Sequence, residues 1–135
     1  MIVELEDARY KLTCLRSDLK ELGNAISIDE LRKTAETLDA QTLDPDFWNN
    51  QENSSKVLQQ IKRTKDKIAE YEALCAKLED AIALAEMALE ENDESCIPEV
   101  NGELAAIIAE EEKQRIEILL SGEYDQNNAI VSFHP

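Results

Sequence analysis

A heptad pattern of apolar residues that continues for about forty residues constrains the fold of this chain more than any other feature. Between about Asn50 and Glu91 the apolar positions recur in alternating steps of four and three, with Thr64 at the one polar position: Val57, Ile61, Ile68, Tyr71, Cys75, Leu78, Ile82, Ala85 and Leu89. The pattern predicts a single helix over 50–91. At about 1.5 Å per residue this helix is roughly 60 Å long. It therefore needs partner helices along its whole length.

The composition predicts an all-α protein. Of the 135 residues, 43% are hydrophobic but only 4% are aromatic, so a core must consist mostly of Leu, Ile and Ala. Three Gly and three Pro are too few for the many turns of an all-β fold. A chain of this length is enough for one ordinary domain.

Two further helices are predicted before the long one. Residues 2–22 carry apolar side chains three and four apart, and Gly23-Asn24 follows as a stop signal. Ser27 and Glu30 match a Ser-x-x-Glu capping box, which predicts the start of a short helix over 28–41.

An aromatic connector separates the short helix from the long one. In the segment 43–50, Pro45 disfavours helical conformation at the residue before it. Phe47 and Trp48 are expected to fill the gap where the short helix meets the long one, and this packing role is favoured over a ligand-stacking role. Asn50 or Asn53 is suited to cap the long helix.

After the acidic run 90–94, which is interpreted as a solvated turn, a fourth helix is predicted over 96–120. Ser95 is suited to cap it and Pro98 lies in its first turn. This helix is expected to run antiparallel to the long one. The predicted architecture is an elongated helical bundle with a long antiparallel helical hairpin.

The last fifteen residues have a different character. A polar, turn-rich stretch covers 121–128, and the β-favouring segment 129–133 reads as a strand. We interpret 1–120 as one helical arm and 121–135 as a junction leading into the first strand of a truncated following domain.

The charge is strongly negative and unevenly distributed. Thirty acidic and 14 basic residues give a net charge of −16, which argues against neutralisation of nucleic-acid phosphates as the main task. Basic residues are concentrated in the first half of the long helix, at Lys56, Lys62, Arg63, Lys65 and Lys67. Residues 68–112 contain 14 acids and only Lys77 as a base. A solvated face is favoured for both regions, and only the basic half is suited to contact phosphates.

No catalytic, cofactor or metal site is predicted. The single histidine is His134, the glycines are isolated, and Cys14, Cys75 and Cys96 lack the spacing of metal ligands and are expected to be free thiols. We therefore expect no enzyme activity from these residues. The N-terminus lacks the features of a secretory leader and no apolar run is long enough for a membrane span, so a cytoplasmic location without membrane contact is expected.

Two motifs resemble the N-terminal domain of bacterial class I peptide chain release factors. The first is Leu-Asp-Pro-Asp-Phe-Trp-Asn-Asn-Gln-Glu at 43–52, followed by Lys-Val-Leu at 56–58. The second is Leu-Leu-Ser-Gly-Glu-Tyr-Asp-Gln-Asn-Asn-Ala-Ile at 119–130. Within the family they favour the branch that reads UGA and UAA over the branch that reads UAG. A paralogous rescue factor built on the same domain is an alternative that the two motifs leave open.

The resemblance implies a role in translation termination without chemistry of its own. The stop-codon tripeptide and the Gly-Gly-Gln loop of the family are absent from these 135 residues. What remains is a ribosome-docking arm directed toward the large-subunit stalk base, its protein and its rRNA, with a functional link to the GTPase release factor and no small-molecule ligand. Lys62, Arg63, Lys65 and Lys67 are the candidate ribosome contacts. A free-standing helical adaptor or scaffold that binds partner helices is the alternative.

Overall fold

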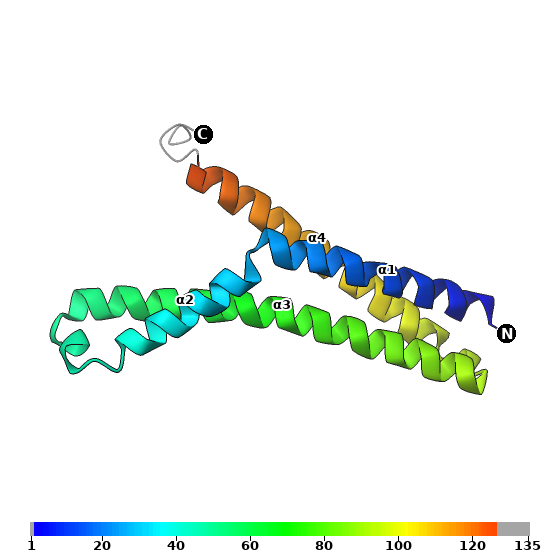
Figure 1. Ribbon diagram of the computed structural model, residues 1–135. Helices are drawn as coiled ribbons and strands as arrows, with labels where there is room; N and C mark the ends of the chain where they lie inside the picture. The colour runs from blue at the N-terminus through cyan, green and yellow to red at the C-terminus, as the bar shows by residue number, and fades with distance from the viewer. Residues whose placement is uncertain (1, 127–135) are drawn as a thin grey trace. The chain divides into compact units, whose positions relative to one another are not determined.

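Every regular element in the described part of the chain, residues 2–126, is helical. The computed structural model contains four α-helices and two short 3₁₀ helices in this range (Figure 1): α1 Val3–Ala25, α2 Ile28–Gln41, η1 Pro45–Asn49, α3 Gln51–Glu91, η2 Glu94–Cys96 and α4 Ile97–Gln126. The all-α class is thus confirmed for these residues. The strand predicted over 129–133 lies outside them.

The helices form two compact units that share α3. The first unit contains α1, the part of α3 from Leu74 onward, and α4. The second unit contains α2, η1 and the part of α3 up to Ala73. The long helix predicted over 50–91 is therefore present as one element, and its two halves have different partners.

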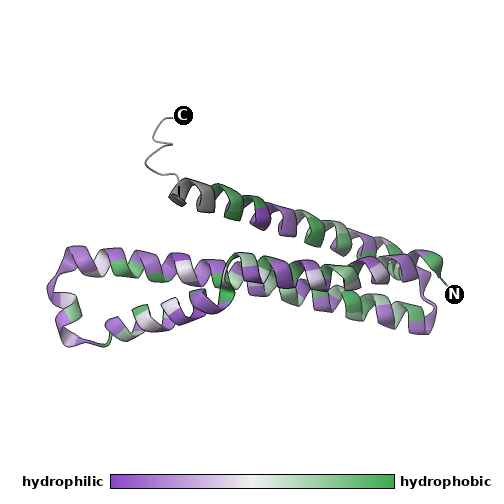
Figure 2. Cartoon of the chain, turned by 45° about the horizontal axis from the view of Figure 1, so that its top comes forward, coloured by the Kyte–Doolittle hydropathy of each residue, from purple (hydrophilic) through white to green (hydrophobic). Residues whose placement is uncertain are grey.

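The first unit is built on a regular leucine stripe along α1. The stripe consists of five leucines and one alanine, spaced three or four residues apart and each at most 7% exposed: Leu5, Ala8, Leu12, Leu15, Leu19 and Leu22. α1 packs against α4, which contributes Val100, Leu104 and Ile107 to the core. In Figure 2 the hydrophobic residues recur along each of these helices with purple, hydrophilic residues between them.

The buried face of α3 in the first unit is wider than the heptad pattern predicts. Of the predicted positions, Leu78, Ile82 and Ala85 are buried, but Cys75 and Leu89 are only half-buried. Three neighbouring positions that the pattern did not include are buried instead, namely Leu74, Ala81 and Ala88. In Figure 1 this part of α3 lies beside both α1 and α4, and two partner helices cover a broader stripe than one.

The aromatic connector closes the core of the second unit. Phe47 is 8% exposed and packs in a cluster with Leu38, Val57 and Ile61. Trp48 stands edge-on to Phe47, with 4.9 Å between ring centroids, and its Nε1 donates a hydrogen bond to the Thr42 carbonyl. The packing role holds for Phe47, whereas Trp48 remains 52% exposed.

Of the end signals predicted for α1, α2 and α3, the one at the start of α3 is confirmed and the other two are wrong. α3 begins as expected, because the Asn50 side chain accepts a hydrogen bond from the Asn53 N–H. The predicted stop at Gly23-Asn24 is wrong, since α1 continues to Ala25. The capping box at Ser27 is also wrong: Ser27 has φ 56° and its side chain caps nothing, while its carbonyl accepts from the Leu31 N–H. A left-handed residue turns its side chain away from the first-turn donors that a capping serine serves.

The turn between α3 and α4 is closed by backbone hydrogen bonds. Asn92 has φ 57°, and the N–H groups of Asn92 and Asp93 bond to the carbonyls of Leu89 and Ala88. This is the pattern of a Schellman motif. The predicted cap at Ser95 is wrong, because Ser95 lies inside η2 and donates from its N–H and hydroxyl to the Asp93 carboxylate.

The end of α4 also differs from the prediction. The sequence placed the helix end at residue 120 and a turn from 121, but α4 continues to Gln126. One glycine in a helix costs only about 1 kcal/mol relative to alanine, so Gly122 does not by itself stop a helix of this length.

The first prediction concerns the core of the first unit. Leu78 is 1% exposed, so Leu78→Ala is expected to lower the free energy of unfolding by about 2–5 kcal/mol through lost burial and a residual cavity. Val3 is 73% exposed and supplies the control: Val3→Ala should change the free energy of unfolding by less than about 0.5 kcal/mol. Urea titration followed by circular dichroism measures both, and equal effects of the two substitutions would contradict the assigned core.

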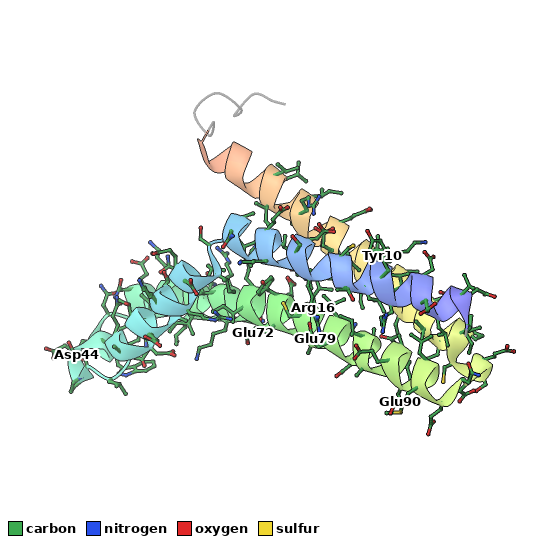
Figure 3. The ribbon with its side chains drawn as sticks, turned by 45° about the vertical axis from the view of Figure 1, so that its right-hand side comes forward. Tyr10, Arg16, Asp44, Glu72, Glu79 and Glu90 are labelled. Carbon is green, nitrogen blue, oxygen red and sulfur yellow. The ribbon has the colours of Figure 1, made fainter. Side chains whose placement is uncertain are left out.

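A second prediction concerns an ion pair between α1 and α3. The Arg16 guanidinium donates two hydrogen bonds to the Glu79 carboxylate, at 2.8 and 2.7 Å, and thereby lowers the pKa of Glu79 (Figure 3). Because the pKa of Glu79 is lower in the folded than in the unfolded state, the ion pair stabilises the fold at pH values above the unfolded-state pKa of about 4.3. This stabilisation is lost as the pH falls through the folded-state pKa.

Glu79→Gln is therefore expected to lower the melting temperature modestly at pH 7 and to have no effect at pH 2. Glu90→Gln is the matched control, because Glu90 is exposed on the same helix and forms no ion pair with a described residue. Calorimetry at both pH values measures the difference from wild type. A Glu79→Gln effect that is the same at pH 7 and pH 2 would show that the ion pair does not contribute.

Candidate functional site

The four basic residues predicted to contact a ribosome all lie on α3 in the second unit, but the structure divides them into two groups. Lys62 and Lys65 are engaged with carboxylates. Arg63 and Lys67 form no ion pair or hydrogen bond with any described residue. The structure thus brings only part of the predicted set together on one accessible face.

The two engaged lysines have different partners. The Lys62 Nζ lies 2.8 Å from Asp66 Oδ2, one turn along the same helix, and this hydrogen bond raises the pKa of Lys62. The Lys65 Nζ lies 3.1 Å from Asp39 Oδ2 of α2. Both pairs are largely exposed, so they hold the lysines only weakly. Their positive charge is nevertheless compensated locally.

Arg63 and Lys67 share a face of α3 with Lys56, because steps of seven and four residues return to the same side of a helix. All three are exposed. We call them the basic ridge. Gln60 lies between them on the same face. Beside the ridge is a shallow hollow of about 350 Å³, lined by Asn53, Lys56, Val57, Gln59, Gln60 and Arg63.

The basic ridge has the chemistry of a phosphate-binding surface. The guanidinium of Arg63 can donate two parallel hydrogen bonds to one phosphate, and the two lysines supply point charges. The amides of the hollow add neutral donors and acceptors suited to sugar hydroxyls. Lys56 belongs to the basic cluster predicted from the sequence but not to the four residues singled out as contacts, and its spacing of seven from Arg63 puts it on the same face.

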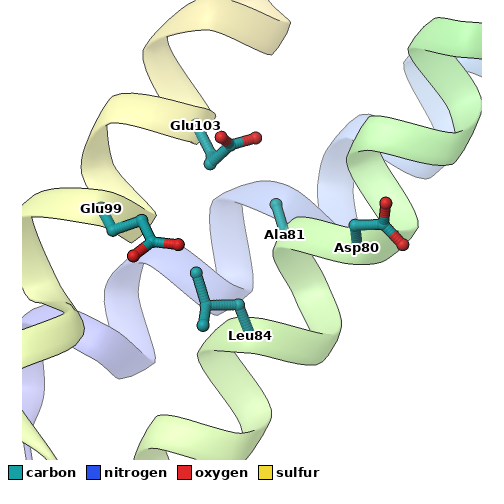
Figure 4. Close-up of a pocket in the computed structure, with 5 residues that line it drawn as sticks. All are labelled: Asp80, Ala81, Leu84, Glu99 and Glu103. Atoms are coloured by element: carbon teal, nitrogen blue, oxygen red, sulfur yellow. The ribbon is translucent and has the colours of Figure 1, made fainter.

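The first unit carries a surface of opposite charge. Asp80 of α3 and Glu99 and Glu103 of α4 surround a cleft of about 250 Å³ whose apolar lining is Ala81 and Leu84 (Figure 4). We call this the acidic cleft. A short apolar floor with carboxylates around it is complementary to a lysine or arginine side chain, whose methylene stem is apolar and whose head is charged.

Among the described residues no group of three or more His, Cys, Asp or Glu side chains is arranged to hold a metal ion. The three cysteines are free thiols; Cys14 is exposed, and Cys75 and Cys96 are half-buried. In the range 2–126, none of the helices combines the length and the apolar character that crossing a bilayer requires.

Comparisons with known proteins extend over most of the chain. The family model of the PCRF domain matches residues 31–135. Peptide chain release factor 2 of Clostridium perfringens strain SM101 is 38% identical over 134 residues, which cover 99% of this chain and 36% of the relative. Peptide chain release factor 2 of Nocardia farcinica is 33% identical over 129 residues, covering 93% of this chain and 35% of the relative. The chain spans about a third of the length of the relatives it matches.

Proposed function

The chain belongs to the PCRF domain family, and we propose that it serves as the ribosome-docking arm of a translation-termination factor that reads UGA and UAA. The membership confirms the family resemblance found in the sequence. The observation that carries the proposal is the match of nearly the whole chain, 99% and 98% of it, to two relatives named peptide chain release factor 2.

The proposal assigns the chemistry of termination to other parts of a longer protein. The described residues form two compact helical units, and among them no group of three or more His, Cys, Asp or Glu side chains could hold a metal ion. We expect stop-codon recognition and hydrolysis of peptidyl-tRNA to depend on sequence outside these 135 residues, including a Gly-Gly-Gln loop. The arm itself is then not an enzyme, and it acts in the cytoplasm.

Two surfaces are suited to two kinds of ribosomal partner. The basic ridge forms no ion pair with a described residue and is proposed to contact rRNA phosphates at the large-subunit stalk base. The acidic cleft is proposed to receive a basic side chain of the stalk-base protein. We also propose that contacts made by the arm affect the action of the GTPase release factor.

The reading frame of the gene tests the proposal as a whole. Continuation past the codon for Pro135 to a Gly-Gly-Gln loop is the expected result. Continuation without that loop would indicate a paralogue that uses the arm for docking. A stop codon after Pro135, with an intact native mass of 15.3 kDa, would contradict the proposal and favour the free-standing helical adaptor.

The third prediction addresses the rRNA contact. In the longer protein, Arg63→Gln combined with Lys67→Gln should weaken ribosome binding and reduce the slope of log affinity against log salt by about 0.7–0.9 for each lost phosphate contact. Binding is measured at several salt concentrations by filtration or fluorescence anisotropy.

Lys62→Gln combined with Lys65→Gln is the matched control. It removes the same charge from the same helix, but from side chains that are already paired with Asp66 and Asp39. The control should change affinity less than the ridge variant and leave the salt slope nearly unchanged. If reversing all four charges, at Lys62, Arg63, Lys65 and Lys67, alters neither affinity nor salt slope, the proposed contact is wrong.

The fourth prediction addresses the acidic cleft. Glu99→Gln combined with Glu103→Gln should slow association with the isolated basic stalk-base protein, because complementary charges mainly accelerate encounter. The control is Glu91→Gln with Glu94→Gln, which removes two exposed acids near the turn and leaves the cleft lining intact. Stopped-flow association at low and moderate salt gives the rates. If both double variants associate at the same rate, the slower association is due to the change in net charge, and the proposed role of the acidic cleft is wrong.

A further inference from the structure

The C-terminal part of α4 exposes large apolar side chains on one side. Ile116, Leu119 and Leu120 are 54%, 56% and 53% exposed, and they lie within five residues of one another. We call these three residues the α4 apolar end. Single exposed apolar residues are ordinary, but a contiguous group is typical of an interaction surface.

This surface is separate from the core side of the same helix. Val100, Leu104, Ile107 and Gln114 are buried within the first unit. At 3.6 residues per turn, the direction of the α4 apolar end is roughly opposite to theirs. The helix therefore has apolar groups on both sides, which is typical of a helix that packs against partners on both sides.

The lengths of the relatives indicate where a second partner comes from. The two Clostridium perfringens relatives each match this chain over only 36% of their length. A protein of that length has much more polypeptide than the 135 residues here, and any part tethered to α4 reaches its surface at a high effective concentration.

Charge argues against the other obvious occupant, a second copy of the chain. Each copy has a net charge of −16, so self-association brings two strongly negative molecules together. We infer that the α4 apolar end is an intramolecular interface, covered by the polypeptide that follows residue 135 in a protein of the relatives' length. The inference needs the family membership but no ribosome contact.

Thiol labelling in two chain lengths tests this inference. Leu119→Cys is introduced into the 135-residue chain and into the longer product of the same gene, and the rate of maleimide labelling is followed by peptide mass spectrometry. Exposed Cys14 on α1 is the internal reference. Relative to Cys14, the introduced thiol should react at least about 10-fold more slowly in the longer protein.

Val3→Cys is the control, because Val3 is 73% exposed on a different helix and should react equally in both lengths. Ile116→Cys serves as a second probe if circular dichroism shows that Leu119→Cys perturbs the fold. Equal labelling of the α4 probes in both lengths overturns the inference. Protection that appears in the 135-residue chain as its concentration rises also overturns it, in favour of a second copy. Ribosome binding enters none of these outcomes.

Discussion

The structure depends on covering the apolar side of α3, a helix of 41 residues. An amphipathic helix of this length gains most of its stability from tertiary packing. The chain supplies two different coverings: α2 and the aromatic connector over Val57 and Ile61, and α1 with α4 over the part from Leu74 onward. Each covering defines a compact unit. The two units arise because no single partner helix in this chain matches α3 in length.

The charge distribution follows from how the helices are held together. Arg16 pairs with Glu79 and Arg32 pairs with Glu72, so these two arginines already link helices within their own units. With 14 basic residues against 30 acids, every base used internally leaves fewer for a partner. On one face of α3, Lys56, Arg63 and Lys67 form no ion pair with a described residue, and we propose this face as the surface for an anionic partner.

Periodicity predicted the helices better than the end signals predicted their limits. The bounds of α2 and α3 match within one residue, because apolar spacing reports burial over many turns. Ser27 and Ser95 failed as caps, since capping depends on the backbone angles of one residue, which the sequence does not fix. The candidate contacts show the same limit. Their clustering was visible in the sequence, but the partner of Lys65 is Asp39, 26 positions away, and only the fold brings the two together.

Helix α4 shows why its sequence cannot be explained by the first unit alone. On its core side Glu111 is 4% exposed, and its carboxylate accepts a hydrogen bond from the Arg115 guanidinium one turn later. On its outer side Leu119 and Leu120 are more than half exposed. In an isolated bundle, burial favours leucines inside and glutamates at the surface, which is the opposite of this arrangement. We infer that this helix serves two environments, and that further polypeptide in a protein of the relatives' length provides the outer one.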